Sequence, residues 1–104
     1  MYSVFLRDWL QVFPMKQFLI LRTEEYATSR IDHLHTVFNF LELGPLTAQQ
    51  VARIEKAPAA NHRRARARSV GAMLPETRRL LTDFYRPYNE DLAALLNDDA
   101  FTWQ

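Results

Sequence analysis

The sequence contains no cysteine and only two glycines, and both shortages limit the sites that it can build. Without cysteine the chain forms no disulfide bond and offers no thiolate to a metal. The two glycines, Gly44 and Gly71, lie too far apart to form a phosphate-binding loop together. We therefore expect no metal site and no complete phosphate loop within these residues.

Long apolar runs and an excess of charge are also missing. The first apolar stretch is broken by Arg7 and Asp8 and ends at Pro14, so it predicts neither a transmembrane helix nor a signal peptide. The formal net charge is +1, from 13 Lys and Arg against 12 Asp and Glu, which gives no overall field for nucleic acid or membrane. Any basic signal must be local.

The apolar residues that are present predict helices. They make up 48% of the 104 residues with Tyr and Trp included, enough for the core of one small domain or for part of a larger one. They recur at helical spacing from Tyr2 to Phe13, over residues 28–43, and after Pro75. Pro14 and the pair Gly44-Pro45 supply stop signals for the first two of these helices.

Local chemistry predicts where the other helices begin. Thr47 and Gln50 have the spacing of a capping box, so a helix is expected to begin at Thr47 and to fade near Lys56. Pro75 suits the first position of the last helix, because a helix needs no N–H donor there. Pro87 is expected to kink that helix or to start a new one.

One short segment, residues 17–22, reads as a strand. Phe18 to Leu21 is apolar and has polar residues on both sides, a pattern typical of a buried strand. A buried strand needs neighbours for its backbone hydrogen bonds, and the sequence offers no second convincing strand. The chain is therefore interpreted as a mostly α-helical part of a larger α/β domain, contributing one strand.

Residues 57–74 show little periodicity and contain a basic run, residues 62–68. We read this segment as a surface loop that a ligand would order in part. One hypothesis is a small helical nucleic-acid-binding module built on this run, with a steep salt dependence as its mark. The near-neutral net charge and the absence of stacking aromatics among the arginines argue against it.

Motifs that occur in order along the chain support another hypothesis. They are Leu6, Trp9, Leu10 and Phe13-Pro14; Phe18 to Leu21 followed by Arg22-Thr23-Glu24-Glu25-Tyr26; Phe40-Leu41-Glu42-Leu43-Gly44; Leu74-Pro75-Glu76-Thr77; and Phe84-Tyr85-Arg86-Pro87-Tyr88-Asn89. This set resembles the Golgi carbohydrate sulfotransferases that use 3'-phosphoadenosine 5'-phosphosulfate (PAPS). Within that family it is similar to the enzymes that sulfate N-acetylgalactosamine 4-sulfate, and the resemblance covers nearly the whole chain.

The resemblance implies a P-loop-like α/β sulfotransferase fold, with residues 1–104 as the C-terminal part of one domain and the N-terminal phosphosulfate-binding part absent. It implies PAPS as the donor substrate and a sulfated glycosaminoglycan, chondroitin or dermatan sulfate, as the acceptor, with no nucleic acid partner and no metal. It also implies a lumenal domain of the Golgi membrane, held by an N-terminal anchor that is absent here. The oligomeric state stays open.

The same resemblance bears on activity. In the family the phosphosulfate loop and the candidate base lie before the helix that opens this chain, so the chain alone is expected to be inactive and no catalytic residue is assigned. It would be either part of an active enzyme or a noncatalytic sulfotransferase remnant. The presence of a phosphosulfate loop in an upstream coding segment would separate these two cases.

Three residues are assigned to the donor by resemblance alone. Related heparan sulfate sulfotransferases have a Lys-Gly-Arg loop shortly before the final helix that helps to enclose the nucleotide, and Arg66, Arg68 and Gly71 occupy roughly that place. The triplet itself is absent here, the spacing to the final helix is shorter, and no cysteine pair braces the loop. Arg63 and Arg64 could instead steer an anionic acceptor.

Other polar residues receive structural interpretations. His33 and His35 are two positions apart on a predicted helix, so they point to different faces and do not suggest a shared metal. Glu24 and Glu25 follow the predicted strand and precede a helix, where carboxylates more often cap helix ends and bind loop backbone than carry out acid-base chemistry.

Overall fold

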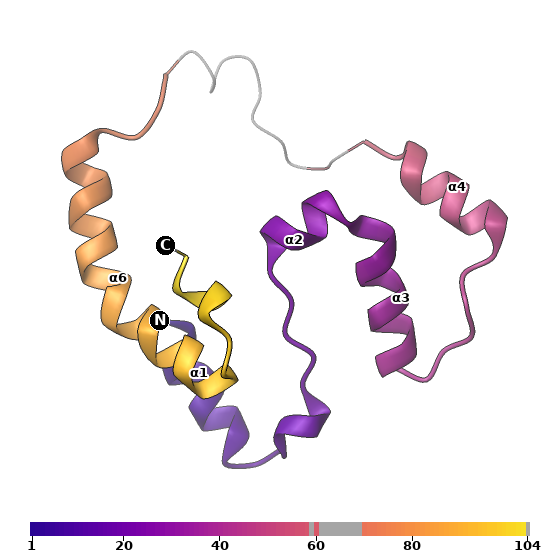
Figure 1. Cartoon of the computed structure of the whole chain (residues 1–104), viewed down its shortest axis with the longest axis horizontal. Coiled ribbons are helices and arrows are strands. Elements are labelled where there is room, and N and C mark those ends of the chain that lie inside the picture. Colours follow the sequence, from indigo (N-terminus) through magenta and orange to yellow (C-terminus); the bar gives the residue numbers. More distant parts are fainter. Residues whose placement is uncertain (59, 61–69, 104) are drawn as a thin grey trace. The chain divides into compact units, whose positions relative to one another are not determined.

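The computed structural model describes residues 1–58, 60 and 70–103, and 69% of this part of the chain is helical. In chain order the elements are α1 (Tyr2–Leu10), the 3₁₀ helix η1 (Met15–Gln17), α2 (Thr23–Thr28), α3 (Arg30–Phe40), α4 (Ala48–Lys56), α6 (Pro75–Leu96) and the 3₁₀ helix η2 (Asp99–Thr102) (Figure 1). They form two units, Met1–Gln17 with Arg63–Gln104, and Phe18–His62. The prediction of a mostly helical chain is confirmed.

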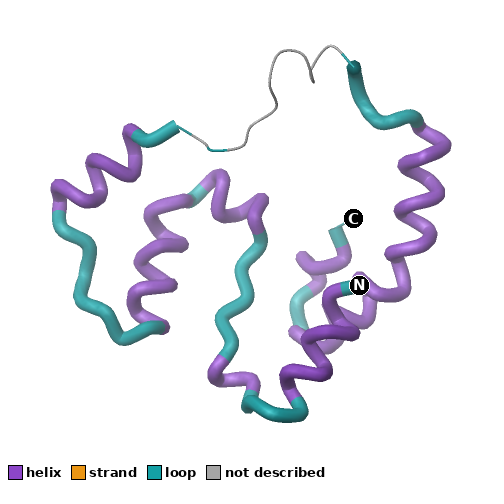
Figure 2. The backbone as a smooth tube through the Cα atoms, turned by 180° about the vertical axis from the view of Figure 1, so that it is seen from behind, coloured by secondary structure: helices purple, strands orange, loops and turns teal. Residues whose placement is uncertain are grey.

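The predicted strand at residues 17–22 is wrong. Gln17 ends η1, and residues 18–22 have irregular backbone; Figure 2 draws no strand in the described part of the chain. Phe18, Leu19 and Ile20 are only half-buried. A strand persists where neighbouring strands pair with its backbone groups, and the described residues supply no such neighbour. The α/β architecture of a larger domain therefore stays a prediction.

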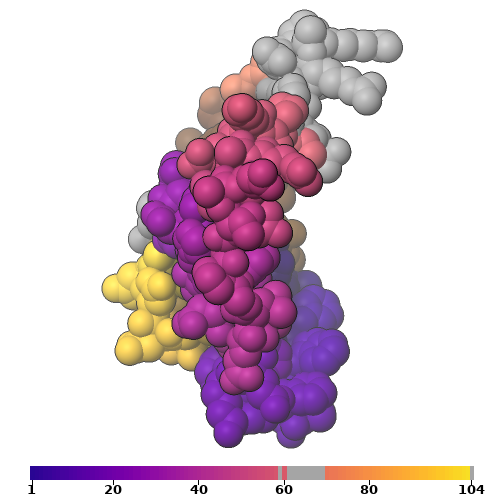
Figure 3. All heavy atoms as spheres, turned by 90° about the vertical axis from the view of Figure 1, so that its right-hand side faces the viewer, coloured from indigo at the N-terminus to yellow at the C-terminus, as the bar shows by residue number. Residues whose placement is uncertain are grey.

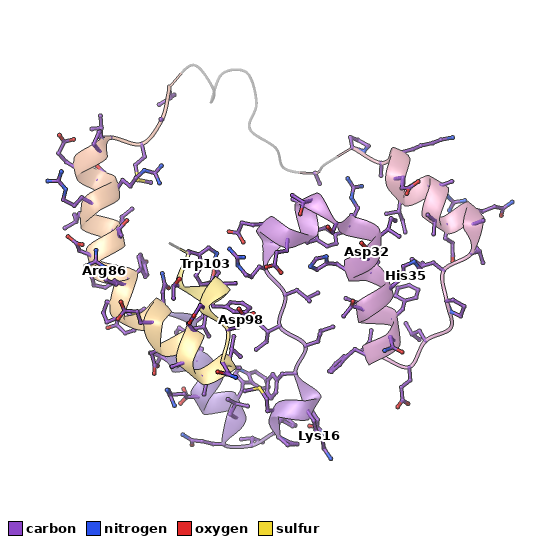
Figure 4. All side chains as sticks on the ribbon, in the orientation of Figure 1. Lys16, Asp32, His35, Arg86, Asp98 and Trp103 are labelled. Atoms are coloured by element: carbon purple, nitrogen blue, oxygen red, sulfur yellow. The ribbon has the colours of Figure 1, made fainter. Side chains whose placement is uncertain are left out.

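The first unit is built by α1 and η2 packing on α6. Ser3 of α1 is fully buried, and Leu92, Ala93 and Phe101 are the buried apolar side chains among the described residues. The ring of Trp103 lies 5.7 Å from that of Phe101, edge to face, so the last residues fold back along the helix (Figure 4). The core of this unit is consequently small.

Helix α6 begins at a proline and ends at a left-handed residue. Pro75 is its first residue, as predicted, and the helix continues through Pro87, with a change of direction partway along in Figure 1. At its end Asn97 has φ 53°, and the N–H of Asp98 donates to the carbonyl of Ala93 at 2.9 Å. These are the features of a Schellman ending, in which a left-handed residue satisfies the last carbonyls.

The second unit contains α2, α3 and α4. The helix predicted over residues 28–43 is present as α3, which spans Arg30–Phe40, and the separate helix α2 precedes it across Ser29. The predicted stop at Gly44 is wrong, because the left-handed residue is Glu42, with φ 58°, and the N–H of Leu43 donates to the carbonyl of Phe38 at 2.8 Å. The backbone geometry of the structure is what distinguishes an ending at Glu42 from the predicted ending at Gly44.

The start of α4 confirms the capping box. The backbone N–H of Gln50 donates to Thr47 Oγ1 at 3.2 Å, and the backbone N–H of Thr47 donates to Gln50 Oε1 at 2.9 Å. At the other end, Arg30 Nη1 of α3 donates to the carbonyls of Ile54 and Ala57, at 2.8 and 3.1 Å. One arginine thus ties α3 to the C-terminus of α4, where a cation also suits the helix dipole.

Candidate functional site

The predicted donor site is described only at its C-terminal end. Arg66 and Arg68, like the whole of the basic run 62–68, lie outside the described residues. Gly71 is described, and its φ of 85° lies in the left-handed region that favours glycine. A Cβ built on Gly71 meets nothing within 4 Å. The glycine is therefore required by backbone conformation and not by a close approach of protein atoms.

Gly71 leads into the first turn of α6 through exposed residues. Leu74 occupies the N-cap position without a side-chain hydrogen bond to the helix, and Glu76 is the acidic residue of the first turn. Arg78 and Arg79 follow in the next positions, both on exposed parts of the helix. This end of the first unit therefore joins a left-handed turn to a helix whose exposed first turns carry one carboxylate and two guanidinium groups.

A second charged cluster surrounds the Arg-x-Glu segment at the start of α2. Arg22, whose side chain is mostly buried, binds Glu25 Oε1 through Nη1 at 3.0 Å and lies 4.0 Å from Glu24 Oε2 through Nε. Both glutamates are in the first turn of α2, where negative charge is favourable. The guanidinium therefore fixes the entry into α2, and the structural interpretation of the two glutamates agrees with this geometry.

His33 joins this cluster from α3. Its Nδ1 lies 2.9 Å from the carbonyl oxygen of Ser29, so the imidazole N–H at this nitrogen is the donor. Its Nε2 lies 3.9 Å from Glu25 Oε2, and its ring meets that of Tyr26 edge to face at 6.2 Å. The side chain is mostly buried, so His33 braces the α2–α3 junction. By helical geometry His35 lies on another side of α3, where it is exposed (Figure 4).

The second unit also has an open hollow of about 350 Å³, lined by Ala27, Thr28, Ser29, Arg30, Ile31, Asp32 and Glu55. Arg30 is engaged with the carbonyls at the end of α4, which leaves carboxylates and hydroxyls as the other polar groups of the wall. Figure 3 looks at α4 (pink), whose side chains cover this side of the unit. The wall does not have the cationic character that a nucleotide sulfate requires.

A metal site needs a group of ligand side chains close in space, and a membrane-spanning helix needs a long apolar stretch. Within residues 1–58, 60 and 70–103, no group of three or more His, Asp or Glu side chains is placed to hold a metal ion. In the same part of the chain, no helix has the length and apolar character needed to cross a bilayer. These statements concern the described residues alone.

Sequence reasoning missed one ion pair that positions α1 on α6. Arg7 donates to both carboxylate oxygens of Asp91, through Nη2 at 2.5 Å and Nε at 3.2 Å. This bidentate hydrogen bond from Arg7 lowers the pKa of Asp91, and the nearby Ser3 hydroxyl lowers it further although its geometry falls short of a hydrogen bond. No local signal could have found this pair, because its partners are 84 residues apart.

Comparisons with known proteins find relatives that match all or most of the chain. The chain is 50% identical over all of its 104 residues to carbohydrate sulfotransferase 15 of Homo sapiens and 49% identical to that of Mus musculus, in each case covering 18% of the relative. It is 40% identical over 92 residues, 88% of the chain and 58% of the relative, to carbohydrate sulfotransferase 15 of Nototodarus sloanii. No family model and no solved structure matches the chain. The chain thus spans less than a fifth of the mammalian relatives.

Proposed function

We propose, from homology to carbohydrate sulfotransferase 15 along the whole chain, that these residues form part of an enzyme that transfers sulfate from PAPS to a hydroxyl of N-acetylgalactosamine 4-sulfate. The acceptor is a chondroitin or dermatan sulfate chain, and the enzyme works in the Golgi lumen. The observation that carries this proposal is 50% identity over 100% of the chain. At that identity two sequences share a fold and commonly share a reaction class.

Within such an enzyme this chain supports the donor site and does not carry out the chemistry. Sulfate transfer needs a base for the acceptor hydroxyl and donors for the charge that develops on the transferred group. In the described residues the best candidates for a base, Glu25 and His33, are engaged with Arg22 and with each other at a helix junction. The base and the phosphosulfate loop belong to polypeptide outside these 104 residues.

The donor contacts of this chain come from the segment before α6. Arg66 and Arg68 supply charge-assisted hydrogen bonds to the nucleotide phosphates, and the left-handed turn at Gly71 redirects the backbone into the helix. The positive charges of Arg63 and Arg64 raise the local concentration of the anionic acceptor. The basic run thereby serves both substrates, which are polyanions.

The test uses a chimaera in which this chain replaces the matching residues of human carbohydrate sulfotransferase 15. Binding of 3'-phosphoadenosine 5'-phosphate is measured by calorimetry for the chimaera, for its Arg66→Ala/Arg68→Ala variant, and for a control variant, Arg78→Ala/Arg79→Ala. Removing one arginine–phosphate hydrogen bond should weaken binding by about ten- to a hundredfold, the range for a charge-assisted hydrogen bond.

Three results would count against all or part of the proposal. A chimaera that neither binds the nucleotide nor transfers sulfate would remove the sulfotransferase assignment for this chain. Normal binding in the Arg66→Ala/Arg68→Ala variant would instead keep the assignment and move the donor contacts elsewhere. A chimaera that binds the nucleotide but transfers no sulfate identifies the chain as a noncatalytic remnant.

A further inference from the structure

Helix α1 exposes an aromatic stripe that faces away from its partner helix. Tyr2, Phe5 and Trp9 lie on one side of α1, at helical spacings of three and four, and are 69%, 63% and 58% exposed. The side of α1 that meets α6 carries the buried Ser3 and the Arg7 that binds Asp91. The aromatic stripe is therefore not the surface on which α6 packs.

Helix α6 carries one apolar stripe of which only the second half is covered. Its C-terminal half, including Leu92, packs on α1 and η2. The first half continues the same stripe at helical spacing but is open, with Leu80 70% and Phe84 55% exposed. The exposed members of the first half are Leu80, Leu81, Phe84 and Tyr85. The packing surface of α6 thus extends beyond the elements that cover it.

We infer that the aromatic stripe of α1 and the open half of the α6 stripe, here called the docking surface (Tyr2, Phe5, Trp9, Leu80, Leu81, Phe84 and Tyr85), bind the remainder of a sulfotransferase domain supplied by polypeptide outside these 104 residues. This inference rests on the proposed function. The occupant follows from length, because the chain matches only 18% of human carbohydrate sulfotransferase 15 and about four fifths of that relative lies outside the match.

The character of the surface favours a domain core over a dimer of this chain. Its members are aromatic and aliphatic, without a charged side chain, as in a core cut in half. On α6 the open half is continuous with a stripe that is already core in its other half. The natural occupant is therefore more of the same domain.

The chain's lack of cysteine makes a clean experiment possible. The 104-residue chain is co-expressed with a separate polypeptide that comprises the rest of human carbohydrate sulfotransferase 15. Single variants Phe5→Cys, Leu80→Cys and Thr82→Cys are labelled with a thiol reagent, and labelling of the short chain is followed on a gel. Thr82 is the control, because it is exposed on α6 but lies outside the apolar stripe.

With the partner polypeptide present, labelling of Phe5→Cys and Leu80→Cys should slow by at least about tenfold, as a side chain enters a packed interface, while Thr82→Cys stays within about twofold. A second arm measures co-purification. The double variant Leu80→Gln/Phe84→Gln should lower the recovered complex by about tenfold or more, because two apolar side chains no longer fill the interface, and Arg79→Gln/Thr82→Gln should leave it unchanged.

Three results would overturn the inference. The two polypeptides do not co-purify, or they co-purify with unchanged labelling, or Phe5→Cys and Leu80→Cys are already slow in the chain alone. In the last case, slow labelling that depends on the concentration of the chain identifies a second copy of the chain as the occupant. Slow labelling that does not depend on the concentration shows that another part of the same chain covers the docking surface. Failure of the proposed function has a different signature: labelling slows as expected, yet the complex binds no 3'-phosphoadenosine 5'-phosphate.

Discussion

Replacing Phe101 by Ala should unfold the first unit, whereas the same change at Phe5 should barely affect it in the chain alone. Phe101 is 7% exposed and its ring contacts that of Trp103, while Phe5 is 63% exposed. A buried Phe→Ala change costs about 3–5 kcal/mol, with about 0.5–1.5 kcal/mol more for removal of an aromatic pair. An exposed Phe should cost less than about 1 kcal/mol.

The magnitude is decisive because the whole chain has little stability to lose. Domains have about 0.05–0.15 kcal/mol of stability per residue, or about 5–15 kcal/mol for a chain of this length. A loss of about 3–5 kcal/mol in a unit with so few buried side chains is comparable with its total stability. The milder change Phe101→Leu should cost about 1–1.5 kcal/mol and leave a transition that can be measured.

The assay is urea unfolding followed by tryptophan fluorescence. Both tryptophans, Trp9 and Trp103, belong to the first unit, so their emission reports the unfolding of that unit. Circular dichroism at the same urea concentrations reports the helices of both units. If Phe5→Ala proves as damaging as Phe101→Ala in the chain alone, the packing of η2 on α6 is not the core of this unit and the reasoning fails.

Three further predictions concern local contacts. Protonation of Asp91 removes its ion pair with Arg7, and this pair holds the folded pKa of Asp91 below its unfolded value near 3.9. The stabilisation by the pair is therefore present above about pH 4 and is lost as the pH falls through the folded pKa. When urea midpoints are measured from pH 6 down to pH 2.5, the midpoint should fall less steeply for Asp91→Asn than for the unaltered chain. Thr47→Ala should destabilise α4 by about 1 kcal/mol, measured by amide exchange at Gln50, with Gln49→Ala as a neutral control. Glu42→Gly should stabilise the second unit by up to about 1 kcal/mol in thermal unfolding, since glycine adopts the left-handed conformation of this position without strain. Gly44→Ala should change the stability of the second unit by no more than about 0.5 kcal/mol. A large loss of stability in Gly44→Ala contradicts the assigned helix ending.

The features that the sequence predicted correctly depend on neighbouring residues. The capping box of Thr47 and Gln50 forms as expected, because both hydrogen bonds lie within four residues. Pro75 begins α6 for an equally local reason, a fixed φ and no N–H to satisfy. Helix α1 covers the predicted stripe up to Leu10.

The features that it predicted wrongly depend on context. An apolar run such as Phe18 to Leu21 is a strand only if other strands pair with it, and the run itself does not contain that information. Gly44 is the helix stop that the sequence predicts, because glycine is the usual left-handed residue, but the chain turns two residues earlier at Glu42. The pairing of Arg7 with Asp91 requires knowing how two distant helices pack. The donor residues Arg66 and Arg68 remain predictions, since they lie outside the described part of the chain.

Helical periodicity identifies a face that should be buried, but not what buries it. The aromatic residues of α1 recur at a spacing that is typical of a core face, but in the structure Tyr2, Phe5 and Trp9 are exposed. Burial of each such side chain would contribute about 1.5–3 kcal/mol, so covering the docking surface offers more stabilisation than the few side chains buried within the unit. The stability of the first unit should therefore depend on its occupant by mass action, and its unfolding temperature should rise with the concentration of the partner polypeptide. An unfolding temperature independent of that concentration, in a complex that co-purifies, would show that the contact lies elsewhere on the chain.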